Sequence, residues 1–441
     1  MSETITETEK IVKIGQSLGA DEIIANTVLG RYRQTRFSNS QIDISVAWND
    51  YVTDVVLTWK KRVVATQIRN FQDVENSVKR LFSLAKASKE NPTWGGVARG
   101  TFNYAKSKAD EAVGNLENPA EYVFEAIEAA RKEAGPSINT GGILFSSLEN
   151  VYLASSEGPN GEDTRSAIEL SIRAFSEREA SGHGVECSST LDDFDPTRAG
   201  KKAGELAKQA RNPKPGLEGR YHVVFDPLFV GSLLGTWGRM TSAFSVMIQQ
   251  SIFVDKLDQK VASEIVTLRD NPAAYSMGNR IFDDEGVPTR ENVLIDKGVL
   301  KTYLHNTSTA KKFQTETTGN AGIIAPTPWN LELDAGRMSR EEMFQEVKHG
   351  LYLTNTWYTR FQNWAKGDFS TIPRDGIFLV EDGEITQSWK DVRISGNALR
   401  MLSNIIGISK EQQPVHWWIE ARPPSLSPYI LIKDVQVTRP K

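Results

Sequence analysis

The sequence has little cysteine, no long apolar run and no excess of one charge, and each absence excludes a class of protein. Cys187 is the single cysteine among 441 residues, so no disulfide can form within the chain, as expected in a reducing compartment. No stretch approaches the roughly 18–20 continuous apolar residues of a membrane span, and the first thirty residues lack the apolar core of a signal peptide. The net charge of −4, with acids and bases interspersed, gives no field that would attract nucleic acid or anionic lipid. These absences predict a cytoplasmic protein that binds neither membrane nor nucleic acid.

The first 212 residues contain a repeat of hydrophobic periodicity. Apolar residues alternate over 42–48 and again over 168–174, which predicts two half-buried strands offset by 126 residues. Helical spacing follows each strand, over 74–85 and 199–210, with an offset of 125 residues. The sequence therefore predicts a duplicated strand-then-helix unit.

Each unit also begins with a predicted helix. The first covers residues 5–19, and the second starts at Asn118-Pro119, where proline suits the first helical position. Residues 90–117, with Pro92 and Gly95-Gly96, are interpreted as an insertion or a linker. The prediction for residues 1–212 is a duplicated helix-strand-helix α/β domain.

The second domain, residues 213–441, follows a break at "NPKPGLEG", where prolines and glycines interrupt all periodicity. A mostly buried apolar helix is expected from Asp226 to about residue 250, and shorter helices over 339–349 and 396–406. Short strands joined by tight turns fill the remainder, with hairpins through Asp296-Lys297-Gly298 and Asp382-Gly383. The fold class predicted for the chain is α+β, with a β-rich, mostly antiparallel and barrel-like second domain.

The stretch "IFDDEGVPTR", residues 281–290, places three carboxylates in a row. Neighbours on an extended chain point to opposite faces, so adjacent acids rarely converge on one metal ion. Gly286 supplies a turn and Pro288 favours extended backbone on either side. We therefore expect Asp283, Asp284 and Glu285 to be solvated turn residues.

Few side chains are available to hold a catalytic zinc, which needs about three protein ligands and an open position for water. The nitrogen and sulfur donors are His183, His222, His305, His349, His416 and Cys187. His183, Glu186 and Cys187 form one local cluster, but in a glycine-rich segment that we interpret as a loop without a paired motif. His222 leads a predicted strand, and His349 is expected in the last turn of a helix. We predict no metal site and no catalytic residue in this chain.

Two further segments allow a structural and a functional interpretation. In "TTGNA" (317–321), Gly319 and Asn320 suit a turn with positive φ, while the hydroxyls of Thr317 and Thr318 could bind a peptide backbone. Ser370, in "GDFS" (367–370), could be a nucleophile, but there is no G-x-S-x-G elbow and no histidine near it in the sequence. The alternation of aromatic residues and proline over 414–428 suggests a contact strip for a dimer.

Ordered sequence blocks in the second half resemble the C-terminal half of the TldD/PmbA family. They are "DNP" (270–272), "FDDEGVPTR" (282–290), "LIDKGVLKTYL" (294–304), "STAKKFQTETTGNA" (308–321), "PWNLELDAG" (328–336), "HGLYLT" (349–354), "KGDFS" (366–370), "GIFLVEDGEI" (376–385) and "RISGN" (393–397). The resemblance implies that Gly367, Asp368, Phe369 and Ser370 lie near an active-site chamber and help to shape a substrate cleft. The alternative is a tight turn with Asp368 bonded to local backbone and Phe369 in the core.

The resemblance also separates two branches of the family. TldD-like members carry HExxxH on the first helix of the C-terminal domain, where two histidines and a later cysteine hold zinc and the glutamate is the expected general base. PmbA-like (TldE) members lack this motif and pair with a TldD-like subunit. Here the corresponding positions, 235–240, read Gly-Thr-Trp-Gly-Arg-Met. The resemblance is therefore to the PmbA-like branch.

The resulting expectation is a zinc-free subunit of a peptidase assembly, with zinc only in a TldD-like partner and with peptides or unstructured segments as substrates. Its cleft candidates are Thr317, Thr318, Gly319, Asn320, Gly367, Asp368, Phe369 and Ser370. Two alternatives stay open. One is a metallopeptidase or other hydrolase active by itself, through residues such as His183 and Cys187 or Ser370. The other is a stand-alone regulatory or binding protein that forms a homodimer.

Overall fold

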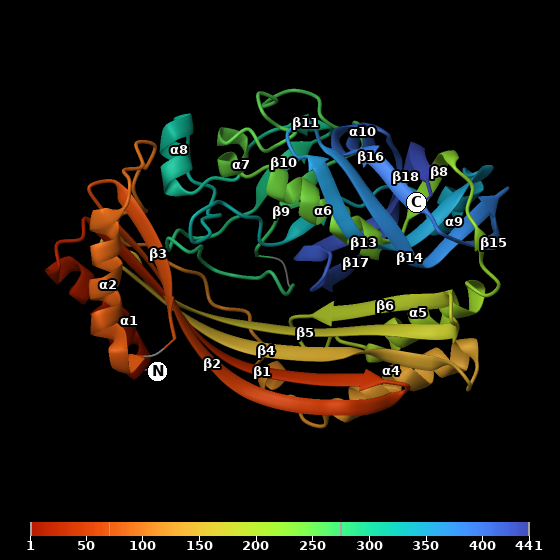
Figure 1. Cartoon of the computed structure of the whole chain (residues 1–441), viewed down its shortest axis with the longest axis horizontal. Coiled ribbons are helices and arrows are strands. Elements are labelled where there is room, and N and C mark those ends of the chain that lie inside the picture. The colour runs from red at the N-terminus through yellow and green to blue at the C-terminus, as the bar shows by residue number, and fades with distance from the viewer. Residues whose placement is uncertain (1, 70, 274–275, 440–441) are drawn as a thin grey trace.

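The computed structural model describes residues 2–69, 71–273 and 276–439, which form two stacked parts (Figure 1). A six-stranded antiparallel sheet forms one part, and the β-rich second half lies over one face of it. The strand order is β3-β2-β1-β4-β5-β6, so two three-stranded meanders meet where β1 pairs with β4. The strands are β1 (Glu22–Ser38), β2 (Gln41–Trp59), β3 (Arg62–Ile68), β4 (Asn139–Ser155), β5 (Asn160–Glu177) and β6 (Ala180–Ser188).

Two helices accompany each meander, which confirms the predicted duplication of helix, strands and helix. The first pair is α1 (Ser2–Ser17) and α2 (Val74–Ala87), and the second is α4 (Pro119–Ala134) and α5 (Pro196–Gln209). A 3-10 turn, Phe71–Asp73, precedes α2, and the predicted insertion contains the single-turn helix α3 (Glu111–Gly114). Asp195 begins α5 by accepting a hydrogen bond from the backbone N–H of Thr197, with Pro196 at the first helical position.

The two predicted half-buried strands differ in burial. Ile168, Leu170 and Ile172 are fully buried against α4 and α5, whereas Trp48 is 40% exposed and Ile44 is 50% exposed. Trp48 shares a sheet face with Phe145, 6.2 Å away between ring centroids, and this face is opposite to the one that α4 and α5 cover. The predicted half-burial is therefore wrong for Ile44, Val46 and Trp48, because α4 and α5 pack on the opposite face of the sheet.

The second part contains a closed ring of paired strands, which confirms the barrel-like prediction. Pairing runs from β18 to β8, β13, β14 and β16 and back to β18. The strands of the second part are β7 (Lys214–Pro215), β8 (Gly219–Phe225), β9 (Leu268–Asp270), β10 (Asn292–Asp296), β11 (Val299–Leu300), β12 (Leu331–Leu333), β13 (His349–Asn363), β14 (Asp368–Glu381), β15 (Glu384–Lys390), β16 (Arg393–Asn397), β17 (Ile405–Trp417) and β18 (Ala421–Thr438). Its helices are α6 (Pro227–Met240), α7 (Ala243–Met247), α8 (Thr307–Phe313), α9 (Arg340–Gln345) and α10 (Ala398–Ser403).

Both predicted hairpins form, but two predicted helices end earlier than expected. The apolar helix stops at Met240 and resumes only as the short α7, because Thr241 and Ser242 bond to carbonyls of the last turn. Helix α9 begins with the predicted Ser339/Glu342 capping box but ends at Gln345. His349 is therefore the first residue of β13, not part of a helix, and its Nδ1 lies 3.5 Å from Glu381 Oε1 across the strand pair.

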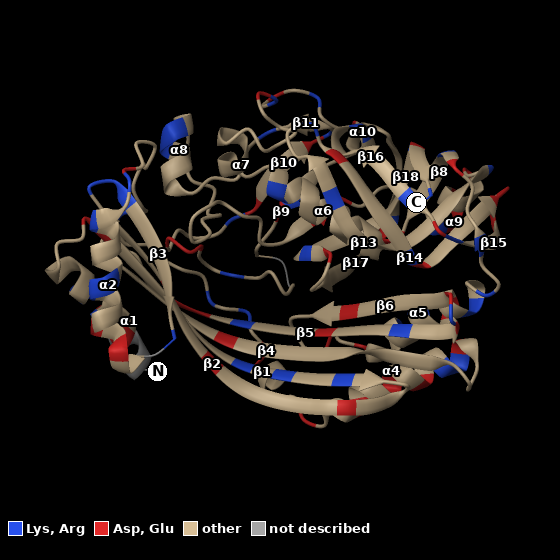
Figure 2. Cartoon of the chain, viewed as in Figure 1, with Lys and Arg blue, Asp and Glu red and all other residues tan. Residues whose placement is uncertain are grey.

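Charged residues of both signs are scattered over both parts of the described chain (Figure 2). Within the described residues, no helix is long and apolar enough to cross a membrane.

Candidate functional site

Helix α6 carries the six positions at which the family resemblance would place HExxxH, and it is tightly packed. Asp226 begins the helix by accepting a hydrogen bond from the N–H of Leu228. A Cβ atom on Gly235 would lie 2.1 Å from the carbonyl oxygen of Arg422 in β18, and one on Gly238 would lie 2.5 Å from Leu331 Cδ1. The backbone of Arg422 therefore requires glycine at position 235, and a histidine there would need β18 to move.

The residues present do not fit a zinc ion. Met240, at the position of the second histidine, is buried in the core, and the Thr236 hydroxyl donates to the carbonyl of Ser232 in the same helix. Over residues 2–69, 71–273 and 276–439, no three or more His, Cys, Asp or Glu side chains are grouped so that they could hold a metal ion.

The cluster of His183, Glu186 and Cys187 lies on strand β6, not in a glycine-rich loop as predicted. Strand alternation separates Glu186 from His183 and Cys187: Glu186 pairs with Arg198 of α5 at 2.6 Å, while His183 faces the second part of the chain. There His183 Nε2 lies 2.9 Å from Ser171 Oγ, and its Nδ1 lies 3.0 Å from Asn355 Nδ2. Burial lowers the pKa of His183 to about 3 and raises the pKa of the Cys187 thiol, so at neutral pH the imidazole is uncharged and the thiol keeps its proton.

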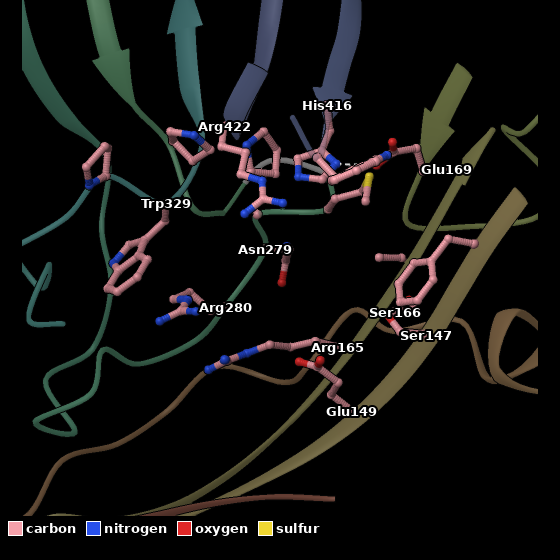
Figure 3. A pocket seen from close by; sticks show the side chains of 18 of the residues that line it. Ser147, Glu149, Arg165, Ser166, Glu169, Asn279, Arg280, Trp329, His416 and Arg422 are labelled. Carbon is pink, nitrogen blue, oxygen red and sulfur yellow. Dashed lines mark hydrogen bonds and ion pairs between the residues drawn. The ribbon is translucent and has the colours of Figure 1, made fainter. Parts of the chain in front are cut away.

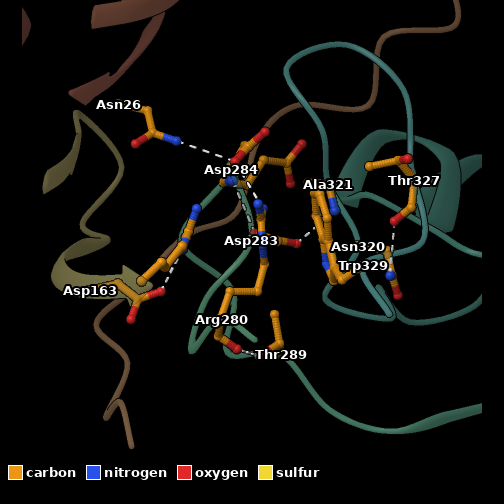
Figure 4. Close-up of polar contacts among 12 residues, drawn as sticks. Asn26, Asp163, Arg280, Asp283, Asp284, Thr289, Asn320, Ala321, Thr327 and Trp329 are labelled. Carbon is orange, nitrogen blue, oxygen red and sulfur yellow. Dashed lines mark hydrogen bonds and ion pairs between the residues drawn. The ribbon is translucent and has the colours of Figure 1, made fainter. Parts of the chain in front are cut away.

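The three consecutive acids lie in a turn, but the prediction that they are solvated is wrong. Asp283 is 0% exposed, and its carboxylate accepts three backbone hydrogen bonds, from the N–H groups of Glu285, Val287 and Ala321. Figure 4 shows Asp283 beside Ala321. Asp284 Oδ1 lies 3.4 Å from Arg280 Nη1 and accepts from Asn26 of the N-terminal sheet. The acids therefore join the turn to distant segments.

Glu285 is expected to make the protein more stable at acidic than at alkaline pH. The side chain is 5% exposed and accepts from the N–H of Thr307, and burial raises its pKa to about 7, while burial and Glu285 raise the pKa of Asp283. A carboxyl whose folded pKa exceeds its unfolded value of about 4.5 holds its proton longer in the folded state. Its contribution to stability is complete below about pH 4.5 and is lost as the pH rises through about 7.

The measurement compares the free energy of unfolding of the wild type and Glu285→Gln between pH 5 and pH 8. The wild type should lose up to about 3 kcal/mol more than the variant over this range, because glutamine does not titrate. Equal pH dependence of the two proteins would contradict the buried, protonated state of Glu285.

The predicted "TTGNA" cleft residues take part in local structure behind a cavity wall. The Thr317 hydroxyl donates to the carbonyl of His305, and the Thr318 hydroxyl accepts from the N–H of His305. Gly319 has φ of +73°, as its turn requires, and its carbonyl accepts from Trp329 Nε1. Asn320 is fully buried and donates to Asp270. Their part in substrate binding stays a prediction.

The predicted "GDFS" residues lie at the start of β14, between β13 and β16. Gly367 has φ of +79°, Phe369 is buried in the core, and Asp368 Oδ1 accepts from Asn397 Nδ2. Ser370 Oγ accepts from Gln362 Nε2. The hydrogen bonds of residues 367–370 involve other partners than those of residues 317–321. The role of residues 367–370 at a substrate cleft also stays a prediction.

A cavity of about 660 Å³ lies between the N-terminal sheet and the second part of the chain (Figure 3). Its volume is in the range of small-ligand sites. Arg165 and Glu149 project into it from the sheet, and Arg422 and His416 project from β18 and β17. Phe145 lines it as well. The cavity is thus lined by segments that lie more than 250 residues apart in the sequence.

Charged groups in this cavity are paired within its wall. His416 Nδ1 is hydrogen-bonded to Glu169 Oε2, and the guanidinium of Arg280 lies 3.5 Å above the ring of Trp329. The sequence interpretation missed these residues. The available signal was a strand in which Arg165 and Glu169 alternate with buried apolar residues, so that both charges lie on one face.

The sequence matches the profiles of two domains of one protein family. The profile of the PmbA/TldA metallopeptidase C-terminal domain matches residues 218–439, and that of the PmbA/TldA metallopeptidase central domain matches residues 109–211. A metalloprotease from Methanothermobacter thermautotrophicus is 31% identical over 301 residues, which cover 63% of this chain and 65% of that protein. A metalloprotease TldD homolog from Buchnera aphidicola is 25% identical over 314 residues, 64% of this chain and 63% of that protein.

The chain thus spans just under two thirds of the length of both curated relatives. Among solved structures, TldE from Thermococcus kodakarensis superposes with a TM-score of 0.86 at 22% identity, covering 98% of this chain and 100% of that chain. The likeness to this structure confirms the α+β fold.

Proposed function

Because the chain belongs to the PmbA/TldD metallopeptidase family, we propose that it is the zinc-free, PmbA-like subunit of a TldD-type peptidase assembly. The observation that carries this proposal is the packing of α6, where the backbone of Arg422 occupies the space that a side chain at position 235 would need. The chain contributes the frame and one wall of a peptide cleft. A TldD-like partner supplies HExxxH, the zinc ion and the general base.

The proposed substrates are peptides and unstructured protein segments of the cytoplasm. Three observations support this class: the relatives are described as metalloproteases, the TldE structure shares the whole fold, and the cavity between the two parts is lined by both charged and aromatic side chains. The segments 317–320 and 367–370 are proposed to support the cleft wall from behind, since their side chains bond mainly within the protein.

The test measures cleavage of an unstructured peptide by the purified chain alone, after chelator treatment and addition of zinc, and by the chain mixed with an HExxxH-bearing homologue. We expect cleavage only in the mixture, and less than about 0.1 zinc per chain by elemental analysis of the chain alone. Zinc-dependent cleavage by the chain alone, or one zinc per chain, would contradict the proposal. Co-purification from native extract provides a second readout, in which the HExxxH-bearing homologue should be recovered.

A further inference from the structure

Two buried side-chain atoms of residues that line the 660 Å³ cavity have no hydrogen-bond partner within the described residues. They are Arg165 Nη2 and Glu169 Oε1, and both side chains line the cavity. Glu169 is 4% exposed, and its other oxygen is bonded to His416; Arg165 Nε donates to Asp163 Oδ2 at 2.8 Å. Leaving a donor or an acceptor of this kind unpaired in a protein interior costs about 1–3 kcal/mol, and more for a charged group. A ligand that accepts a hydrogen bond from Arg165 and donates one to Glu169 would remove this cost.

The Arg165 end of the cavity suits an anionic group. Arg280 holds its guanidinium over the ring of Trp329, and burial together with the charge of Arg165 lowers the pKa of Arg280 to about 10. Two guanidinium groups that repel each other are stabilised by an anion that both can contact. Planar carboxylates match the donor fork of arginine in geometry.

The charges around the cavity are mixed, which argues against a ligand that is only anionic. Asp163 and Asp284 already pair with Arg165 and Arg280, and Glu149 accepts from the Tyr32 hydroxyl. A phosphate dianion would therefore meet carboxylates as well as guanidinium groups. A ligand with an acceptor group at one end and N–H donors at the other complements both unpaired groups.

The spacing of the two groups fits a short extended peptide. Arg165 and Glu169 are four residues apart on one face of β5, which corresponds to roughly 13 Å along a strand. Three or four extended peptide residues cover this distance. Trp329 supplies aromatic surface beside the carboxylate end, and Phe145, which pairs with Glu169 across the sheet, supplies it at the other end.

We propose that this cavity binds the carboxyl-terminal end of a short peptide, with the terminal carboxylate at Arg165 and Arg280 and a backbone N–H or amino group at Glu169. The choice of a peptide over other carboxylates rests on the proposed function, but binding needs this chain alone. The cavity then retains a carboxylate-bearing peptide fragment rather than taking part in bond cleavage.

The test is calorimetric titration of the full chain with acetyl-Ala-Ala-Phe carrying a free carboxylate and with the same peptide as its carboxamide. The free carboxylate should bind at least 10-fold more tightly than the amide. Ala167, which lies between Arg165 and Glu169 on the same face, lines the cavity, so Ala167→Phe should abolish binding. Ala47→Phe, at an exposed position on another strand, is the matched control and should bind like the wild type.

A second variant keeps the proposal testable if Ala167→Phe does not fold. Glu169→Gln preserves the shape of the side chain. It should weaken binding of Ala-Ala-Phe, the same tripeptide without the acetyl group, at least fivefold. Equal affinities for the carboxylate and the amide, no binding of either, or displacement of the peptide by equimolar inorganic phosphate would each overturn the proposal. Peptide cleavage by the chain alone would contradict the zinc-free role and would leave the carboxylate preference unaffected.

Discussion

Gly235→Ala is expected to lower the free energy of unfolding by about 3 kcal/mol, although alanine is the better helix former by about 1 kcal/mol. The added Cβ would lie 2.1 Å from the carbonyl oxygen of Arg422, well inside van der Waals contact. The obstacle is backbone, so no rotamer change can relieve the clash, and β18 must move away from α6. Overpacking of a close-packed interior costs about 1–3 kcal/mol, and contact with backbone belongs at the upper end.

Urea unfolding and the thermal midpoint of the purified variant measure this effect. Gly396→Ala in β16 is the matched control, because its new Cβ would meet its nearest atoms at 3.4 Å or more. The control should stay within about 1 kcal/mol of the wild type. If Gly235→Ala were as stable as the wild type, β18 would be free to withdraw from α6, and a histidine at this position would no longer be excluded on steric grounds.

Turn chemistry made the hairpins of the second part predictable from the sequence. Asp382 and Gly383 have φ of +48° and +86°, and Lys297 and Gly298 have φ of +45° and +82°. Conformations of this kind favour Gly, Asn and Asp, so the signal lies within two or three residues. The helix-strand-helix repeat was predictable for a similar reason, because each of its periodicities is local.

The loop predicted around His183 was wrong, because the glycines of this segment serve close packing and not a turn. Gly182 and Gly184 suggested a loop, yet both lie within β6. A Cβ on Gly182 would lie 2.2 Å from the carbonyl oxygen of Ala203, and one on Gly184 would lie 2.0 Å from that of Ala199. Both contacts are with α5, so these glycines allow the helix to approach the strand, and no local sequence rule distinguishes this use from a turn.

The cavity and the buried acids were not predictable, because their partners are remote in the sequence. Glu169 is hydrogen-bonded to His416, 247 residues away, and Asn26 donates to Asp284, 258 residues away. A row of acids before Gly-Val-Pro has the composition of an exposed turn, and only the tertiary structure buries it. Hydrophobic periodicity predicts which strands form, but it does not predict which charged faces will be enclosed between the two parts of the chain.

Asp283→Ala is expected to cost about 4 kcal/mol of the free energy of unfolding, the largest loss among the acids of this turn. The substitution leaves three backbone N–H groups, those of Glu285, Val287 and Ala321, without their acceptor in a dry environment. Each orphaned donor costs about 1–3 kcal/mol. Part of this cost is offset, because burial and Glu285 already raise the pKa of Asp283 and so make its ionised form unfavourable.

Asp284→Ala is the neighbouring control, measured by chemical unfolding at pH 7 together with Asp283→Asn. Asp284 pairs with side chains, Arg280 and Asn26, so its removal should cost less than half as much. The asparagine keeps one acceptor oxygen and turns a donor toward an N–H group, so an intermediate loss is expected. Equal losses for the two alanine variants would mean that Asp283 contributes only its charge. A dominant loss at Asp283 would show that its carboxylate holds the turn by accepting from the three backbone N–H groups.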